Sequence, residues 1–226
     1  MKNVTPCACR VLLVAAGILS LHLTILAQVP NTNVNAVGYL NVSVLPGFNL
    51  VSNQLRYSPA YTVADLAGSL QGNVPDGLSV YLVFPEGYRS ATYDTSSRTF
   101  EPADIAAEEL SPGRGFFLFN PATNALLLTF VGEFMQGTLT NNVPAGFSLV
   151  ASMVPQEATL AVLGFPTEPG DVVYRFNPLT QMFVAAVFDD IDGAWMPRIP
   201  QPYAGEAFVV FKNRPATWTR TFFVNP

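Results

Sequence analysis

The densest group of residues that could do chemistry is an acidic run in the last quarter of the chain. Asp189, Asp190 and Asp192 are followed directly by Gly193. Carboxylates at alternate positions before a glycine resemble part of a calcium-binding loop, because Ca²⁺ prefers oxygen ligands. The glutamate that closes such a loop is missing, and Asp and Gly also build ordinary turns. A calcium site is therefore one interpretation and an Asp-rich hairpin turn is the other, and no further cofactor is predicted.

A second acidic group could supply a pair of catalytic carboxylates. Glu108 and Glu109 follow Glu101 and Asp104 closely in the sequence. Two carboxylates at a suitable separation can hydrolyse a glycosidic bond without a histidine. Adjacent acids in an Ala-rich segment usually form a solvated surface, so a carboxylate-only glycoside hydrolase is the least favoured function.

Aromatic residues make up 12% of the chain, and exposed rings could stack on sugars. Tyr88, Tyr93 and Trp195 recur at positions that hold another aromatic residue in the internal repeat described below, which indicates core packing. The rings without such a counterpart are the better candidates for contact with a glycan: Tyr57, Tyr61, Tyr203 and Trp218. Burial is still the default for any large apolar ring.

The first residues have the pattern of an export signal. Lys2 and Arg10 precede the apolar run 11–19. This run is too short to span a membrane, which needs about 20 apolar residues. Ala27 is a small residue that suits a cleavage site, so residues 1–27 are predicted to be a signal peptide that leaves no membrane span behind.

Removal of residues 1–27 changes the chemical inventory of the chain. Cys7, Cys9 and His22 are lost, and they are the only cysteines and the only histidine. Two of the eleven basic residues and none of the sixteen acidic ones are lost as well, which moves the formal net charge from −5 to −7. The remaining chain lacks the side chains for Ser-His-Asp or Cys-His catalysis, for ordinary zinc, haem or copper sites and for disulfides. Its acidic balance also disfavours nucleic acid as a partner, because phosphate contacts dominate that affinity.

The strands and helices that carry these residues belong to an internal repeat. Segments 38–53 and 137–152 are identical at seven of sixteen positions without a gap. The blocks 88–94 and 112–119 recur in the same order later in the chain. We therefore predict two duplicated tandem units of about 95 residues, within 28–134 and 135–226, joined without a linker.

Each unit is predicted to be mostly β. Alternating residues predict a strand over 37–44, and a Pro-Gly turn predicts a hairpin with 48–53. A helix is expected over 62–70, with a weaker counterpart over 158–163. The other strands expected in the first unit are 78–83, 88–94, 115–120 and 126–132. Short strands at regular spacing predict all-β, sandwich-like or barrel-like units, each with one short helix. Residues 116–119 are apolar on both faces, which predicts a central strand that is covered on both sides.

The repeated residues resemble a tandem β-rich repeat of secreted bacterial envelope and extracellular proteins. In that repeat a glycine, an aromatic and a polar residue precede Leu-Val-Ser or Leu-Ile-Ser, and Pro-Gly-x-Gly with two aromatic residues closes the unit. Here these motifs are 47–52 and 112–117, and their counterparts at 146–151 and 204–208 depart from the pattern at Ala151, Ala204 and Ala207. The resemblance covers nearly the whole chain after residue 27 and implies turn glycines and core aromatics without catalytic residues.

These observations favour an exported, non-enzymatic protein with a structural or interaction role outside the cytoplasm. The expected location is the periplasm, the cell surface or the extracellular space. The alternative is a carbohydrate-binding module. The expected partner is a cell-envelope polysaccharide or another surface protein.

Overall fold

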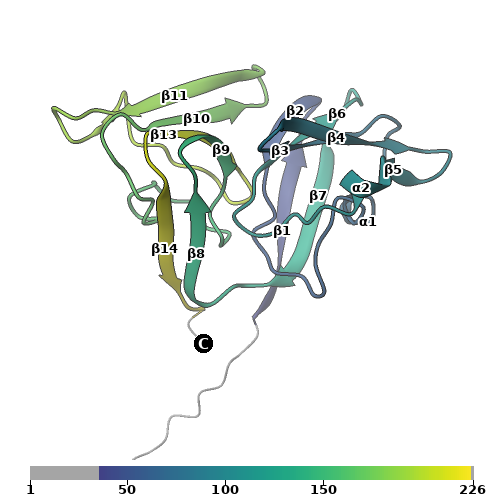
Figure 1. Cartoon of the computed structure of the whole chain (residues 1–226). Helices are drawn as coiled ribbons and strands as arrows, with labels where there is room; N and C mark the ends of the chain where they lie inside the picture. The colour runs from purple at the N-terminus through teal and green to yellow at the C-terminus, as the bar shows by residue number, and fades with distance from the viewer. Residues whose placement is uncertain (1–35, 225–226) are drawn as a thin grey trace, which may run out of the picture. The chain divides into compact units, whose positions relative to one another are not determined.

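Runs of alternating apolar and polar residues, separated by glycine and proline turns, form an all-β protein (Figure 1). The structure, a computed structural model, describes residues 36–224, and the predicted signal peptide lies outside them. The strands of the first half are β1 (Val37–Val44), β2 (Gly47–Val51), β3 (Ser79–Phe84), β4 (Gly87–Asp94), β5 (Thr99–Glu101), β6 (Phe116–Asn120) and β7 (Leu126–Glu133). Those of the second half are β8 (Gly137–Val143), β9 (Gly146–Val150), β10 (Val172–Asn177), β11 (Met182–Phe188), β12 (Trp195–Met196), β13 (Phe208–Lys212) and β14 (Ala216–Phe222).

The two halves have the same strand order. In the first half a five-stranded sheet has the order β2-β6-β3-β4-β5 and a two-stranded sheet pairs β1 with β7. In the second half the orders are β9-β13-β10-β11-β12 and β8-β14, and every pairing is antiparallel. The expected all-β, sandwich-like class is confirmed. A duplication would account for the shared order, and it stays a prediction.

The predicted hairpin between 37–44 and 48–53 is wrong. Strand β1 pairs with β7 along its whole length, and β2 pairs with β6. The turn at Gly47, whose φ is 87°, therefore carries the chain from one sheet to the other. Val44 before the turn and Val51 after it are both buried in the core of the first half. A local turn signal does not distinguish a hairpin from a corner between two sheets.

The helices are shorter and placed differently than expected. The predicted helix over 62–70 is reduced to α1 (Leu66–Ser69), because the Asp65 carboxylate accepts hydrogen bonds from the Thr62 N–H and hydroxyl and holds a turn before it. A second helix, α2 (Ala103–Ala106), also lies in the first half. In the described part of the second half, 160–164 form turns and no helix is present. The expected distribution of one helix per unit is therefore not observed.

Each half has its own hydrophobic core. Phe116 and Leu118 of β6 are fully buried in the first core, and β6 lies between β2 and β3, which confirms the predicted central position. The prediction that β6 is covered on both sides is wrong, because Phe117 and Phe119 on its outer face are only partly buried. The second core is built around Phe208 and Trp218. A third, small cluster contains Leu50 together with residues of the second half and joins the two.

The open edge of β2 is covered by a segment of the second half. The Ser52 N–H donates to the Gly205 carbonyl at 2.9 Å, and the Ala207 N–H donates to the Leu50 carbonyl at 3.3 Å. The covering segment is the one that leads into β13.

The open edge of β9 is covered in the same way by the segment that leads into β6. The Ala151 N–H donates to the Gly113 carbonyl at 3.0 Å, and the Gly115 N–H donates to the Leu149 carbonyl at 3.4 Å. The repeated glycine motifs therefore join the halves in addition to forming turns. All of these residues belong to one compact unit.

Gly115 tests this contact, because a Cβ atom there would lie 2.7 Å from the Ala207 Cβ and 3.3 Å from the Leu149 Cβ. We expect Gly115→Val to lower the free energy of unfolding by about 1–3 kcal/mol through overpacking, measured by urea denaturation. Gly68→Ala in α1 is the matched control, since a Cβ there meets nothing within 4 Å. Equal stability of Gly115→Val and the wild type would contradict a close approach of the halves.

Candidate functional site

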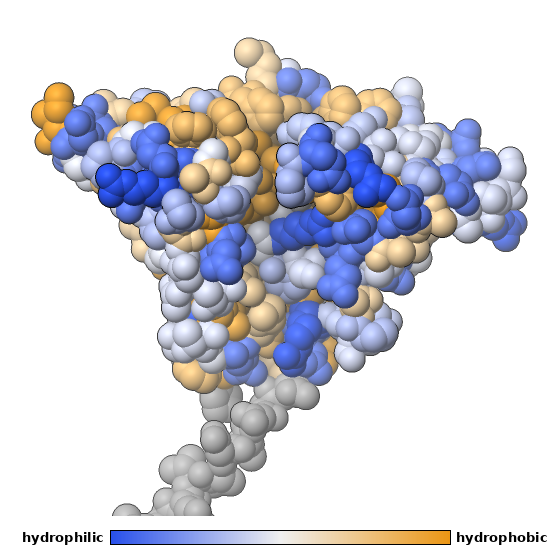
Figure 2. Space-filling model, in the orientation of Figure 1, coloured by the Kyte–Doolittle hydropathy of each residue, from blue (hydrophilic) through white to orange (hydrophobic). Residues whose placement is uncertain are grey.

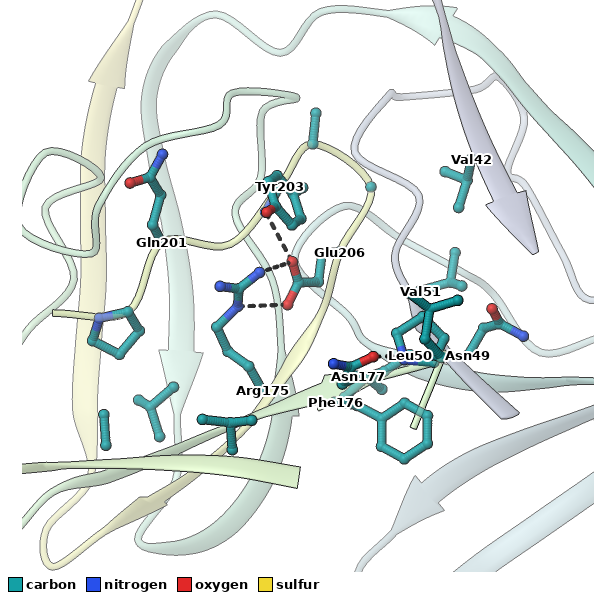
Figure 3. Close-up of a pocket in the computed structure, with 18 of the residues that line it drawn as sticks. Val42, Asn49, Leu50, Val51, Arg175, Phe176, Asn177, Gln201, Tyr203 and Glu206 are labelled. Carbon is teal, nitrogen blue, oxygen red and sulfur yellow. Dashed lines mark hydrogen bonds and ion pairs between the residues drawn. The ribbon is translucent and has the colours of Figure 1, made fainter. Parts of the chain in front are cut away.

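A groove of about 770 Å³ lies between the two halves (Figure 3). Its floor is the inner face of β10 and β11, with Val173, Arg175 and Val184. One wall comes from β1 and β2, and the other comes from the connection between β12 and β13, residues 197–207.

The second half lacks the apolar cover that the first half has. In the first half the connection between β5 and β6 supplies this cover, and its residues Ile105 of α2 and Leu110 are buried in the core. The equivalent connection, from β12 to β13, is three residues shorter and contains no helix. Three prolines, at 197, 200 and 202, disfavour a helix there as well. The inner face of β11 is therefore left partly open, and Val184 is 57% exposed.

A charged pair occupies the groove beside this opening (Figure 3). Arg175 donates from Nε to Glu206 Oε1 at 2.7 Å and from Nη2 to Oε2 at 2.6 Å. The Tyr203 N–H also donates to Oε2, at 3.0 Å, and its ring centroid lies 5.0 Å from the guanidinium carbon. Burial lowers the pKa of Arg175, but Glu206 and Tyr203 outweigh it and hold that pKa above its ordinary value. The pair is therefore charged and rigid.

The groove has polar groups that could meet a ligand. Both oxygens of Glu206 are occupied, and Glu206 is the only carboxylate among the groove residues. The side-chain amide nitrogen of Asn177 donates no hydrogen bond within residues 36–224, where the Asn177 side chain only accepts through its oxygen. The groove can therefore receive carbonyl or hydroxyl oxygens, with apolar walls around them.

Two of the four rings predicted to stack on a glycan are buried, so that prediction is wrong for them. Tyr61 is 7% exposed, its hydroxyl lies 2.5 Å from the Ser69 Oγ, and burial raises the pKa of Tyr61. Trp218 is 4% exposed, and its Nε1–H donates to the Leu163 carbonyl at 2.9 Å. Both rings lie on the inner side of their sandwich, where the absence of an aromatic counterpart does not prevent burial.

The other two predicted rings are exposed but separate. Tyr203 lines the groove. Tyr57 packs edge-on against Tyr61, with centroids 6.1 Å apart, and does not line the groove. The four residues therefore do not form one sugar-binding surface.

The acidic run forms a turn. The Asp189 carboxylate accepts hydrogen bonds from the N–H groups of Ile191, at 2.7 Å, and Asp192, at 3.2 Å. No group of three or more potential metal ligands converges anywhere in residues 36–224, so Asp189, Asp190 and Asp192 are not brought together. The hairpin-turn interpretation accounts for the observed contacts.

The four acids of the second acidic group, Glu101, Asp104, Glu108 and Glu109, each interact with a different residue. Asp104 pairs with Arg89, and Glu108 lies 3.2 Å from Arg114. Glu109 accepts a hydrogen bond from the Ser111 hydroxyl, and Glu101 accepts one from the Thr99 hydroxyl. None of these four acids lines the groove.

The most extended feature was not predicted from the sequence: a row of aromatic rings on the outer faces of both five-stranded sheets, here called the aromatic band. Neighbouring ring centroids lie 4.9–6.4 Å apart. The rings are Tyr81, Phe119, Phe48, Phe117, Phe176, Phe183, Tyr174, Phe147 and Phe211. Phe117 connects the halves, through Phe176 at 5.8 Å and Phe183 at 6.3 Å.

The band is partly open to solvent. Phe147 is 65% exposed, Phe183 46% and Phe48 38%. Figure 2 shows apolar residues gathered at the top of the view, over the strands that carry these rings. The sequence contains an indication of the band in residues 116–119, where the two outward-facing residues, Phe117 and Phe119, are aromatic. Repeated aromatics were interpreted as core, which is correct for Tyr93 and Trp195 but wrong for Tyr88, which is 61% exposed.

No protein-family model matches the chain, and no curated protein or solved structure is detectably similar to it. The resemblance to secreted β-repeat proteins therefore stays a prediction. No helix within residues 36–224 is long and apolar enough to cross a membrane.

Proposed function

We propose that the chain is an exported, non-enzymatic interaction protein that binds an apolar surface of another protein through the aromatic band. The observation that carries this proposal is the continuous, partly exposed row of rings across both halves. Soluble monomers rarely expose large contiguous apolar patches, and those that occur usually mark interaction sites. Aromatic residues are also enriched in protein–protein interfaces.

The orientation of the rings favours a protein over a glycan as the partner. Sugars stack on ring faces that are open and parallel to the surface. Neighbouring rings of the band are inclined at 43–89° to one another, so they cover part of each other's faces. Seven of the nine are phenylalanines, which offer no hydrogen bond to sugar hydroxyls.

The groove supports a non-catalytic role. General acid–base hydrolysis of a glycoside needs two carboxylates that flank the bond. The one carboxylate in the groove, Glu206, is bound by two nitrogens of Arg175. The Glu206 carboxylate also accepts a hydrogen bond from the backbone N–H of Tyr203.

A carbohydrate-binding function is the second candidate, and Tyr203 is the observation that favours it. Tyr203 is 57% exposed in a groove that also contains the side-chain amide of Asn177. If this candidate is correct, Tyr203→Ala should abolish retention on an insoluble polysaccharide, and Tyr57→Ala should leave it unchanged.

The deciding experiment compares binding of residues 28–226 to envelope proteins of the producing cell and to insoluble polysaccharides. We expect the double variant Phe147→Ser, Phe183→Ser to weaken binding to the protein partner at least tenfold, because aromatic hot spots each contribute about 2 kcal/mol or more. Tyr88→Ser is the matched control, since Tyr88 is equally exposed but lies outside the band. Retention on a polysaccharide that free sugar competes away, with no effect of the double variant, would contradict the proposal.

A further inference from the structure

We propose that the open edge of β11 pairs with β11 of a second copy of this chain, across a two-fold axis at Val184. The pairing would join the two five-stranded sheets of the second halves into one. This inference goes beyond the proposed function and does not depend on it, because it concerns the sheet edge and not the partner of the aromatic band.

The open edge is defined by the hydrogen bonds at the end of β11. The backbone of Phe188 bonds to residues that lead into β10, and the Asp189 N–H donates on the opposite side, to the Ala194 carbonyl at 2.9 Å. Backbone groups of successive strand residues alternate between the two sides. The N–H and C=O groups of Phe183 and Ala185 therefore point to the side where β11 has no neighbour. Strand β12 pairs only with Val187 and Phe188.

The corresponding edge in the first half is protected. Strand β4 carries Arg89, which pairs with Asp104 of α2, and α2 packs against β4. Charged residues and covering helices are common devices that stop edge strands from pairing. Strand β11 has neither, because the second half has no helix among its described residues and no charged residue occurs over 176–188.

The side chains of this edge are apolar and exposed. Met182 is 64% exposed, Phe183 46% and Val184 57%. Phe183 belongs to the aromatic band, and Val184 lines the groove. An added strand would therefore extend the band with its outward side chains and cover the end of the groove with its inward ones.

A second copy of the same strand fits this edge. The open window is 182–186, because the turn between β10 and β11 precedes it and β12 covers the edge from Val187 onward. Antiparallel pairing centred on Val184 places Phe183 opposite Ala185 of the other copy. Each such pair exchanges two hydrogen bonds, so all four open backbone groups are satisfied.

Charge also favours self-pairing. The chain carries an excess of acidic residues, which disfavours most contacts between two copies. The acids nearest to β11 in the sequence are Asp189, Asp190 and Asp192, all beyond its C-terminal end. Antiparallel pairing places the two acidic turns at opposite ends of the shared strand pair, so no like charges face each other.

The first test is the mass of residues 28–226 by sedimentation equilibrium over a range of concentrations. We expect dimers in the wild type and at least a tenfold weaker association for Val184→Lys, because the two lysines would face each other across the axis. Leu179→Lys, in the turn outside the window and 80% exposed, should associate like the wild type.

Cysteine substitution tests the register, and residues 28–226 contain no other cysteine. Directly opposite residues of a non-hydrogen-bonded antiparallel pair have Cα atoms about 4.5 Å apart, which a disulfide can span. Val184→Cys should therefore cross-link on mild oxidation, and Ala185→Cys should not, because it faces Phe183 of the other copy. A monomer at all concentrations, equal cross-linking of the two cysteine variants, or a Val184→Lys dimer would overturn the proposal. A monomer whose binding to an envelope protein is lost in Val184→Lys would also overturn it, since a foreign strand would then occupy the edge.

Discussion

Replacing Lys212 by methionine should lower the free energy of unfolding by about 3–5 kcal/mol, because it leaves a buried carboxylate without its counter-charge. Lys212 and Asp171 have side chains that are 0% exposed, and the Nζ lies 2.5 Å from Asp171 Oδ2. The Nζ also donates to the Pro166 carbonyl at 2.7 Å. The Oδ1 atom of Asp171 has no hydrogen-bond partner even in the wild type. Urea denaturation followed by tryptophan fluorescence measures the loss.

The first half supplies the matched control for this prediction. The positions that correspond to Asp171 and Lys212 hold Leu78 and Asn120, both buried. The double variant Asp171→Leu, Lys212→Asn removes both charges and should be more stable than Lys212→Met, since breaking a buried pair costs more than replacing it. A double variant less stable than the single one would show that the ion pair itself, and not the unpaired carboxylate, decides the effect.

The strands were predictable because their signals are local. The alternation over 37–44 predicted β1 at its observed bounds, and the doubly apolar segment 116–119 predicted the central position of β6. The pairing of β1 was not predictable in this way. A Pro-Gly turn fixes the direction of the chain over a few residues, but the partner of β1 is set by residues more than 80 positions away, in β7.

The groove exists because the second half lacks the apolar cover that α2 provides in the first half. The sequence of one segment alone does not show that this cover is missing. Arg175 occupies the strand position that Leu82 holds in the first half, where Leu82 is fully buried. An arginine on the inner face of a strand predicts a groove only if the connection that covers that face is known to be too short to bury it. Here the shorter connection before β13 and the missing α2 create the opening, and Glu206 comes from that same connection.

The aromatic band shows why residue type alone did not predict exposure. Phe116 and Phe117 are adjacent, yet the first is fully buried and the second lies in the band, because successive side chains of a strand point to opposite faces. Repetition of an aromatic residue indicates a shared position in the fold. It does not indicate whether that position faces the core or the solvent.

Trp218 gives the second large effect, and it separates a core residue from a binding residue. We expect Trp218→Ala to lower the free energy of unfolding by about 3–5 kcal/mol, because it leaves a cavity and removes the donor to the Leu163 carbonyl. The ring packs against Phe165 at 5.0 Å and Phe208 at 6.3 Å between centroids. In the first half the corresponding strand position holds Leu128, which is also buried.

Tyr203→Ala is the matched comparison for Trp218→Ala, because both residues were candidates for sugar contact on the same sequence criterion. Tyr203 is exposed, its ring lies against the Arg175 guanidinium, and its backbone N–H, which alanine would keep, donates to Glu206, so its loss should change stability by about 1 kcal/mol or less. Thermal and urea unfolding of the two variants, each measured beside the wild type, should therefore differ by several kcal/mol. A Trp218→Ala variant with wild-type stability and reduced binding to a polysaccharide would contradict the buried position, since a ring that packs between two aromatic neighbours and donates to a buried carbonyl cannot be removed without loss of core energy.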